Sequence, residues 1–286
     1  MRFYLLLVTF VFCQACTSQL VIKTIYNDMD GMFADSINDL ADFNPEQQDA
    51  IERVGDELAA WHRNTQLPLY RAFTVDAKTM LTQPINEAQM EQLATQIELF
   101  GDALAERPWP LLLDALKDIN EEQIDQIAAS LEKELSKREE EYTEERQERD
   151  PKDPHRETLK DVRKTFKRLL QVKLSDEQLR PFKKGIEFSV DLNVDEIRIE
   201  REWNTGFVAL LRSQKGTPNT QALLDHMLIG TKLLRTHYPK EVAENRRVAL
   251  NAMRETFNLL NQQQRERLLQ RLQFYVELID VLQKDR

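Results

Sequence analysis

The residue types best suited to chemistry in this chain are its histidines, and their spacing matches neither a metal site nor a catalytic site. No two of them form the His-Glu-x-x-His pattern that puts two zinc-binding imidazoles on one face of a helix. No serine lies in the Gly-x-Ser-x-Gly turn of hydrolases, and no glycine-rich loop suits a phosphate group. The sequence therefore predicts no catalytic residue, no metal site and no cofactor. The four histidines are His62, His155, His226 and His237.

Acidic residues are the second group that could do chemistry. Asp28 and Asp30, just before Gly31, resemble the start of a calcium-binding loop, but the central glycine and the terminal glutamate of such a loop do not follow. Other pairs of carboxylates are spaced as on an exposed helix face. This spacing does not indicate the catalytic carboxylate pair of a glycosidase. An enzyme that acts on cell wall or lipid stays an alternative, with a site around His62 and nearby carboxylates.

Cys16 is the residue with the most specific predicted chemistry, the attachment of lipid. It follows Ala15 and an apolar stretch, residues 3–12, that is too short to span a bilayer and begins after a single basic residue. This order is typical of bacterial lipoprotein signals, in which the peptidase cuts before a cysteine whose thiol carries lipid. Residues 1–15 are therefore predicted to be a signal peptide and residues 16–286 a helical periplasmic domain.

The residues around Cys16 also bear on location. Cys13 stands where leucine is usual in such signals, and an ordinary cleaved signal or an uncleaved anchor stays the alternative. Thr17, rather than aspartate, follows Cys16, and by resemblance to enterobacterial sorting rules this favours the outer membrane. Because one acyl chain binds a membrane only weakly, the anchor is expected to be the multi-acyl bacterial type, with chains such as palmitate.

Composition excludes several classes of protein. The net charge of −10 argues against nucleic acid as a partner, as does the predicted compartment. After cleavage Cys16 would be the only cysteine, so no disulfide would stabilise the chain. Glycine and proline are scarce, with 7 and 10 among 286 residues, and charged residues make up 31%. This composition favours long helices that pack through apolar faces.

A local cluster of aromatic and basic residues is the candidate interaction corner. Its proline is expected to end or kink the helix that carries the tryptophan, because proline interferes with the preceding turn. Two interpretations stay open. One is a packed corner with a hydrogen-bonded histidine and the two large aromatic residues in the core, and the other is a recognition corner for a partner protein. The corner consists of Trp61, His62, Arg63, Pro68 and Tyr70.

A short pattern recurs five times and predicts helix starts. In each copy Asn or Ser is followed three residues later by Gln, with apolar residues on either side. The first residue suits an N-cap that accepts a hydrogen bond from a backbone N–H, and the glutamine can reach back to the N–H of the cap, which completes a capping box. The pairs are Asn44 and Gln47, Asn86 and Gln89, Asn120 and Gln123, Ser175 and Gln178, and Asn261 and Gln264.

Apolar residues recur at helical spacing along nearly the whole chain, which predicts an all-α fold, an elongated multi-helix bundle. Residues 131–149 are nearly all charged, a proline-containing turn follows at 149–155, and a basic amphipathic stretch comes next. We therefore predict a long charged antiparallel helical hairpin over about residues 120–173, whose basic face either pairs with the acidic arm or docks an anionic partner. A heptad-like seam near the C-terminus comprises Leu268, Leu272, Tyr275, Ile279 and Leu282.

Several of these features occur together within residues 16–75. They are the lipidation signal, Tyr26-Asn27, the cap at residues 43–47 and the corner at residues 61–70. In this combination the chain resembles an uncharacterised family of proteobacterial lipoproteins, catalogued as a domain of unknown function (DUF6279). The resemblance implies an all-helical periplasmic domain on a lipid anchor and supplies no catalytic residue.

The recurring cap is also similar to the Leu-Thr-x-x-Gln motif of small helical periplasmic stress chaperones, with Asn or Ser in place of Thr. Three hypotheses for function follow. The first is a non-enzymatic envelope accessory protein that binds another envelope protein through apolar helix grooves. The second is a periplasmic chaperone for unfolded clients, with exposed apolar patches. The third is a cell-envelope enzyme whose pocket gathers polar groups.

Overall fold

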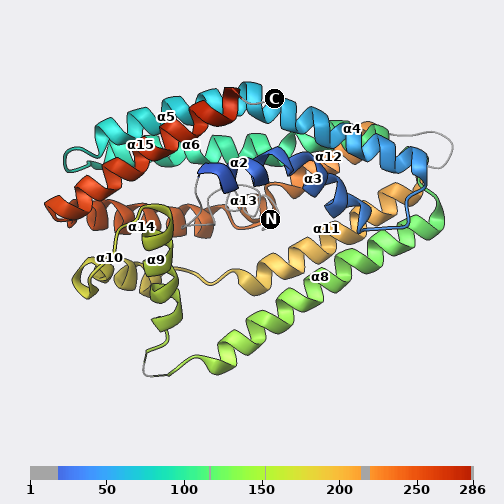
Figure 1. Ribbon diagram of the computed structural model, residues 1–286. Helices are drawn as coiled ribbons and strands as arrows, with labels where there is room; N and C mark the ends of the chain where they lie inside the picture. Colours follow the sequence, from blue (N-terminus) through green and yellow to red (C-terminus); the bar gives the residue numbers. More distant parts are fainter. Residues whose placement is uncertain (1–18, 116, 152, 214–219, 285–286) are drawn as a thin grey trace.

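The computed structural model describes residues 19–115, 117–151, 153–213 and 220–284, and every regular element within them is a helix (Figure 1). The predicted all-α class is confirmed. The predicted signal peptide and the lipid-bearing Cys16 lie outside the described residues.

The helices follow one another through short connections. From the N-terminal side they are α2 (Gln19–Asn27), α3 (Met29–Asn38), α4 (Pro45–Trp61), the π-helical turn η1 (His62–Gln66), α5 (Leu67–Met80), α6 (Glu87–Glu106), α7 (Pro108–Ala115) and α8 (Glu121–Glu148). They continue with α9 (Arg156–Leu169), α10 (Asp176–Phe188), α11 (Asn193–Ser213), α12 (Thr220–Gly230), α13 (Leu233–His237), α14 (Pro239–Asn258) and α15 (Gln262–Lys284).

All five predicted capping boxes are present. At the start of α4 the Asn44 Oδ1 accepts a hydrogen bond from the backbone N–H of Gln47 at 2.9 Å, and the Gln47 Oε1 accepts one from the N–H of Asn44 at 2.9 Å. The same reciprocal pair begins α6, α8, α10 and α15. Each box satisfies two backbone donors that a helix start otherwise leaves without partners.

Four of the five boxes also meet one another in two pairs. Gln47 and Gln123 are both only 4% exposed, and each side-chain amide donates to the oxygen of the other, at 3.2 Å and 2.7 Å. Gln178 and Gln264 are joined in the same way, at 2.7 Å and 3.0 Å. The starts of α4 and α8, and those of α10 and α15, are therefore tied together through helix caps.

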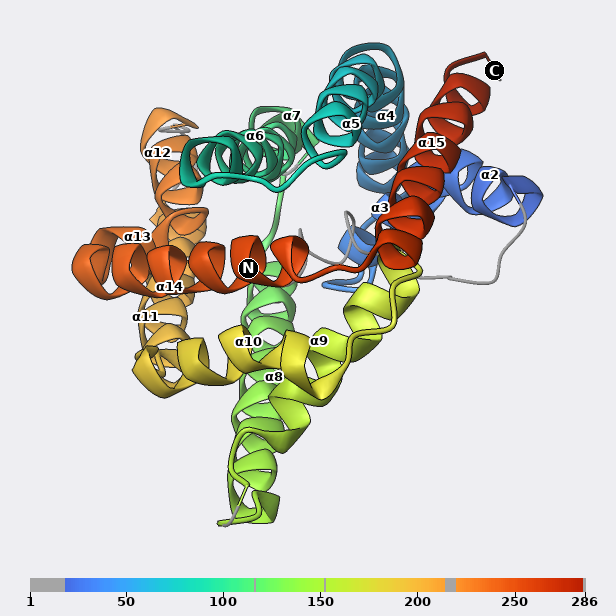
Figure 2. The ribbon, with the colours of Figure 1, turned by 90° about the vertical axis from the view of Figure 1, so that its left-hand side faces the viewer.

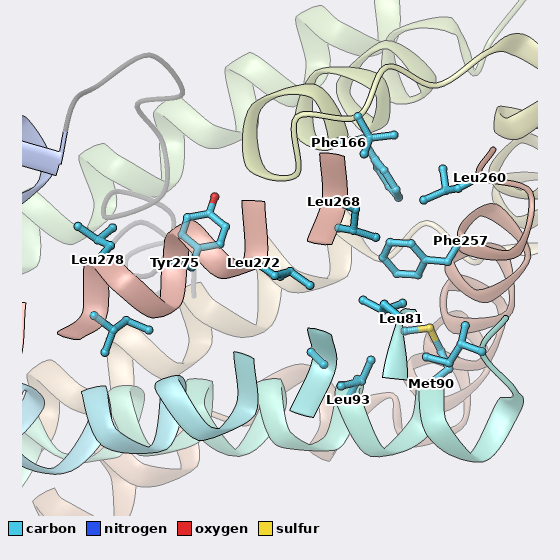
Figure 3. Close-up of a cluster of buried hydrophobic side chains, with 14 of the residues drawn as sticks. Leu81, Met90, Leu93, Phe166, Phe257, Leu260, Leu268, Leu272, Tyr275 and Leu278 are labelled. Carbon is cyan, nitrogen blue, oxygen red and sulfur yellow. The ribbon is translucent and has the colours of Figure 1, made fainter. Parts of the chain in front are cut away.

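A first hydrophobic core is formed by α2, α5, α6, α9, α10, α14 and α15 (Figure 3). Phe166 of α9 and Phe257 of α14 meet here with ring centroids 5.8 Å apart, and Leu268 of α15 is fully buried beside them. The predicted seam of α15 faces this core, and all five of its residues are buried. Burial of this seam accounts for the position of α15 in the bundle.

The α15 helix runs antiparallel to α5 and lies beside it (Figure 1). Near the start of α5, Arg71 Nε is 2.6 Å from Asp280 Oδ1, which belongs to the end of α15. Near the end of α5, Lys78 Nζ donates to Gln273 Oε1 at 2.7 Å. The C-terminal helix is thus held against α5 over most of its length by polar contacts outside a shared apolar face.

A second hydrophobic core is formed by α3, α4, α7, α8, α11 and α12. Ile51 of α4, Ile124 of α8 and Met227 of α12 are fully buried in it. Figure 2 shows α8 running downward, away from α5, α6 and α15 of the first core. The two cores are therefore served by largely different helices, and α4 continues through η1 into α5 to connect them.

The predicted hairpin of charged helices is wrong in its pairing. The turn at residues 149–155 does separate α8 from α9, but α8 packs antiparallel to α11 instead of α9 (Figures 1 and 2). Arg201 of α11 bonds both Glu132 and Glu139 of α8, at 3.1 Å and 2.9 Å. The α9 helix turns its apolar face, including the buried Phe166, into the first core.

Apolar burial explains this choice of partner. Leu135 of α8 is only 2% exposed, and α8 packs along α11, whose Arg201 and Glu200 match charges of α8. The basic face of α9 remains outside, where Arg163 pairs with Asp176 at the start of α10. The segment near residue 187 lies in the last turn of α10.

Candidate functional site

A cavity of about 330 Å³ lies beside the second core, and all three tryptophans of the chain line it. Its walls come from helices far apart along the chain, chiefly α3, α4, α7, α8, α11 and α13. Its volume lies in the range of ligand pockets, which hold about 300–1,000 Å³. Most lining side chains are aliphatic or aromatic, among them Leu58, Trp61, Trp109, Leu131, Trp203 and Leu234.

The α3 wall of the cavity is an apolar stripe at helical spacing. Met29, Phe33 and Ile37 all line the cavity from this helix. Gly55 of α4 allows α3 to come close, because a Cβ atom at this position would lie 2.7 Å from the backbone oxygen of Asp30. Since real Cβ atoms do not approach a backbone that closely, only glycine fits at this helix crossing.

Trp203 is held in place from two sides. Its Nε1 donates to the backbone oxygen of His226 at 2.8 Å, and its ring stacks on the imidazole of His226 with centroids 5.1 Å apart. Below it, a Cβ atom on Gly230 would lie 2.5 Å from Cε2 of the indole. This histidine, which the sequence left without a role, therefore positions an aromatic wall of the cavity.

The wall formed by α8 and α11 also carries charge. Arg138 Nη1 of α8 is 2.6 Å from Glu200 Oε2 of α11, and these side chains are 15% and 22% exposed. Glu134 and Glu196 line the cavity as well, and within the described residues neither has an ion pair. The wall thus combines one ion pair with two carboxylates that no basic side chain neutralises.

The predicted interaction corner is built around the buried His62. Its Nδ1 is 3.0 Å from the hydroxyl of Tyr26, and the ring of Tyr70 packs edge-on against it with centroids 5.4 Å apart. Burial, and to a smaller extent the charge of Arg63, lowers the pKa of His62 to about 4. His62 is therefore neutral at pH 7, and its ring can accept a hydrogen bond from the hydroxyl of Tyr26.

Tyr70 of this corner and Tyr26, both of which contact His62, are also neutral at pH 7. Burial raises the pKa of Tyr26 to about 12, although the nearby Arg63 acts in the opposite direction. Burial, with a smaller effect from Tyr26, raises the pKa of Tyr70 well above its ordinary value. The hydroxyl of Tyr70 is buried and lacks a hydrogen-bond partner in the described part of the chain. The corner is thus a neutral aromatic cluster rather than an acid–base pair.

Pro68 interrupts the helix as expected, and the interruption takes the form of a π-helical turn. The α4 helix ends at Trp61, η1 follows, and the N–H of Leu67 donates to the carbonyl of His62, one residue beyond the α-helical spacing. Proline lacks an N–H, and its ring would clash with the carbonyl one turn earlier, so the wider turn relieves that clash. Single π-helical turns are frequent at functional sites.

The structure divides the five corner residues between four environments. Trp61 and His62 line the cavity, and Tyr70 packs against His62. Arg63 lies over the ring of Tyr26 with its guanidinium carbon 5.3 Å from the centroid, and Pro68 is exposed. Recognition of a partner protein by this corner stays a prediction.

Sequence reasoning did not connect the three tryptophans with one another. Each lies on its own helix, and helical spacing shows only that a residue faces inward. Which space it faces depends on how α4, α7 and α11 pack, and this packing brings Trp61, Trp109 and Trp203 to one cavity.

Neither a metal-binding cluster nor a membrane-spanning helix is found in the described part of the chain. No three histidine, cysteine, aspartate or glutamate side chains are gathered as a metal ion would require. Among the described helices, none is both long and apolar enough to cross a membrane.

Comparison with known proteins gives one match. The model of a family of unknown function (DUF6279) matches residues 39–238, a segment that begins near the end of α3 and stops where α14 begins. This segment contains the three tryptophans, the buried pair of Gln47 and Gln123 and the π-helical turn. No curated protein and no solved structure matches the chain. Because the match covers well over half of its length, the chain belongs to this family of unknown function.

Proposed function

We propose that this protein is a non-enzymatic binding protein of the bacterial cell envelope, and that the cavity receives an apolar ligand. The observation that carries the proposal is the lining of the cavity, in which three tryptophans and many aliphatic side chains surround about 330 Å³. Apolar cavities exclude water and take up apolar molecules, and an engineered cavity of about 150 Å³ in another protein already binds benzene.

The side chains that line the cavity favour binding over catalysis. Within the described residues, the only histidine at the cavity is hydrogen-bonded to Tyr26 and has no carboxylate partner. The basic side chain at the cavity, Arg138, is engaged by Glu200. The tryptophans and leucines of the lining supply contact area for a hydrocarbon, and no histidine–carboxylate pair is found among the described lining residues.

The volume of the cavity favours a small ligand over an unfolded polypeptide. A space of about 330 Å³ accommodates one molecule of the size that ligand pockets usually enclose. A chaperone for unfolded clients would instead need an extended apolar surface. The envelope protein predicted as a partner remains part of the proposal, and the exposed Pro68 and Leu69 beside the corner are where we place its contact.

Occupation of the cavity is testable with an uncharged fluorescent dye, N-phenyl-1-naphthylamine. All three tryptophans line the cavity, so a dye bound there should quench their emission by energy transfer. We expect Ala59→Phe, which places a ring in the cavity, to weaken dye binding by more than about tenfold. The neighbouring Ala60→Phe is the control, because Ala60 is exposed outside the cavity. Absence of dye binding, or equal binding by the two variants, would contradict the proposal.

The lipid anchor is tested by a second substitution. Cys16→Ala removes the predicted acylated thiol, so we expect the full-length protein to leave the membrane fraction of cells for the periplasmic fraction. Cys13→Ala serves as the control and should remain with outer-membrane vesicles on a density gradient. Retention of Cys16→Ala in membranes, or the absence of incorporated labelled palmitate from the unaltered protein, would refute anchoring through this residue.

A further inference from the structure

We infer that the ligand is a single-chain amphiphile with a positively charged amino group at its head. This inference rests on the proposed function, since it assigns the head of the molecule whose hydrocarbon part the cavity holds. It is carried by the arrangement of charge in the wall formed by α8 and α11, which differs from the lining contributed by the other helices.

The charged residues of this wall are spread along the two helices. The two helices run antiparallel, with Arg138 beside Glu200 and Tyr142 beside Asp191. On α11, Glu196 precedes Trp203 by seven residues on nearly the same face, a distance of about 10 Å along the helix. Because Arg138 pairs with Glu200, Glu134, four residues before Arg138, lies near the level of Trp203. The two carboxylates therefore line different levels of this wall.

One of the two carboxylates also reaches solvent. Glu134 lines the cavity and is exposed, whereas the next residue along α8, Leu135, is 2% exposed and lines it as well. A ligand that entered beside Glu134 would leave its head at this carboxylate and its chain against the apolar lining. This orientation is the one an amphiphile adopts, because only its chain gains from leaving water.

The charge of the ligand's head group follows from the charged side chains of the α8–α11 wall. Arg138 is neutralised by Glu200, and the neighbouring arginines of α11 are engaged elsewhere: Arg198 pairs with Glu202, and Arg201 pairs with Glu132 and Glu139. Glu134 and Glu196 have no ion pair within the described residues. An ammonium group would supply the missing positive charge, whereas a carboxylate or phosphate head would be repelled.

Three detergents with twelve carbon atoms in their chains test this inference on the mature protein. Dodecylamine, dodecanoate and dodecyl maltoside differ only in their heads, which are positive, negative and uncharged at pH 7.5. Tryptophan fluorescence, followed below the micelle concentration of each, reports binding because all three tryptophans line the cavity. We expect dodecylamine to bind more than about tenfold more tightly than dodecanoate, with the maltoside between them.

A matched pair of double variants separates the effect of the two cavity glutamates from the effect of the protein's net charge. Replacing Glu134 and Glu196 by glutamine should reduce the preference for the amine to less than about threefold. Replacing Glu140 and Glu144, exposed residues of α8 that do not line the cavity, makes the same change in net charge and should leave the preference intact. Far-ultraviolet circular dichroism checks that both variants keep their helices.

The outcomes for the two proposals differ. If none of the three detergents binds, the proposed function fails. If all three bind with equal affinity, the apolar site stands and the amino head group is wrong. If the amine is preferred but both double variants lose the preference equally, attraction to the net charge of −10 explains it and the inference is again wrong.

Discussion

Replacement of Gln47 by alanine is expected to lower the free energy of unfolding by about 3 kcal/mol, whereas the same change at Gln89 should lower it by less than about 1 kcal/mol. Both glutamines complete a capping box in the same sequence pattern. They differ in that Gln47 is 4% exposed and bonded to a second cap, while the box of Gln89 is exposed and bonds only its own helix start.

The physical reason is the group that the substitution leaves behind. In Gln47→Ala the buried amide of Gln123 loses a donor and an acceptor, and the backbone N–H of Asn44 loses its acceptor. A buried polar group without a partner costs about 1–3 kcal/mol. Gln123 still donates to the carbonyl oxygen of Asp42 at 3.0 Å, so the loss is partial.

Urea denaturation of the four proteins of a double-mutant cycle measures this effect. The cycle comprises the unaltered chain, Gln47→Ala, Gln123→Ala and the double variant, compared at constant m-value. We expect the double variant to lose much less than the sum of the single losses, because each single change already breaks the pair. Additive losses, or losses equal to that of Gln89→Ala, would show that the paired caps act independently.

The second large effect is expected in acid. The protein should lose about 3 kcal/mol of stability between pH 6.5 and pH 4 through His62 alone. The folded-state pKa of about 4 lies below the value of 6.5 for an unperturbed histidine, so the unfolded chain binds the proton first as the pH falls. This stability is fully present above pH 6.5, decreases through the window and is lost below pH 4.

Stability measured between pH 6.5 and pH 5 isolates this histidine from most carboxylates. In that interval the slope due to His62 approaches about 1.4 kcal/mol per pH unit, and His62→Gln should remove it. His237→Gln is the control, because His237 is exposed at the end of α13 and should leave the slope unchanged. A direct nuclear magnetic resonance titration with an imidazole midpoint near 6.5 for His62 would refute the prediction.

The helix starts could be predicted because their causes are local. Asn44 and Gln47 bond each other across three residues, and the same holds for the four other boxes. Likewise the inward face of α15 follows from spacing within that helix, and the interruption before Pro68 follows from the chemistry of proline. Each of these interactions acts within one or two helical turns.

The pairing of elements could not be predicted in the same way. Gln47 and Gln123 are separated by 76 positions, and all five boxes look alike in the sequence, so nothing local says which boxes meet. Nearness in sequence predicts that the charged arm at α8 pairs with the next helix along the chain, yet α8 packs against α11. Competition between apolar faces over the whole chain decided that outcome.

The candidate site shows the same division. The helix interruption at Trp61 and His62 and the helical class of the chain could be predicted, because short-range hydrogen bonds and side-chain periodicity set both features. The meeting of Tyr26 with His62, and the single cavity lined by three tryptophans from separate helices, follow from the packing of the helices. Those contacts depend on how helices far apart in the chain bury their apolar faces together. Residue spacing within one helix does not show which other helix that face will meet.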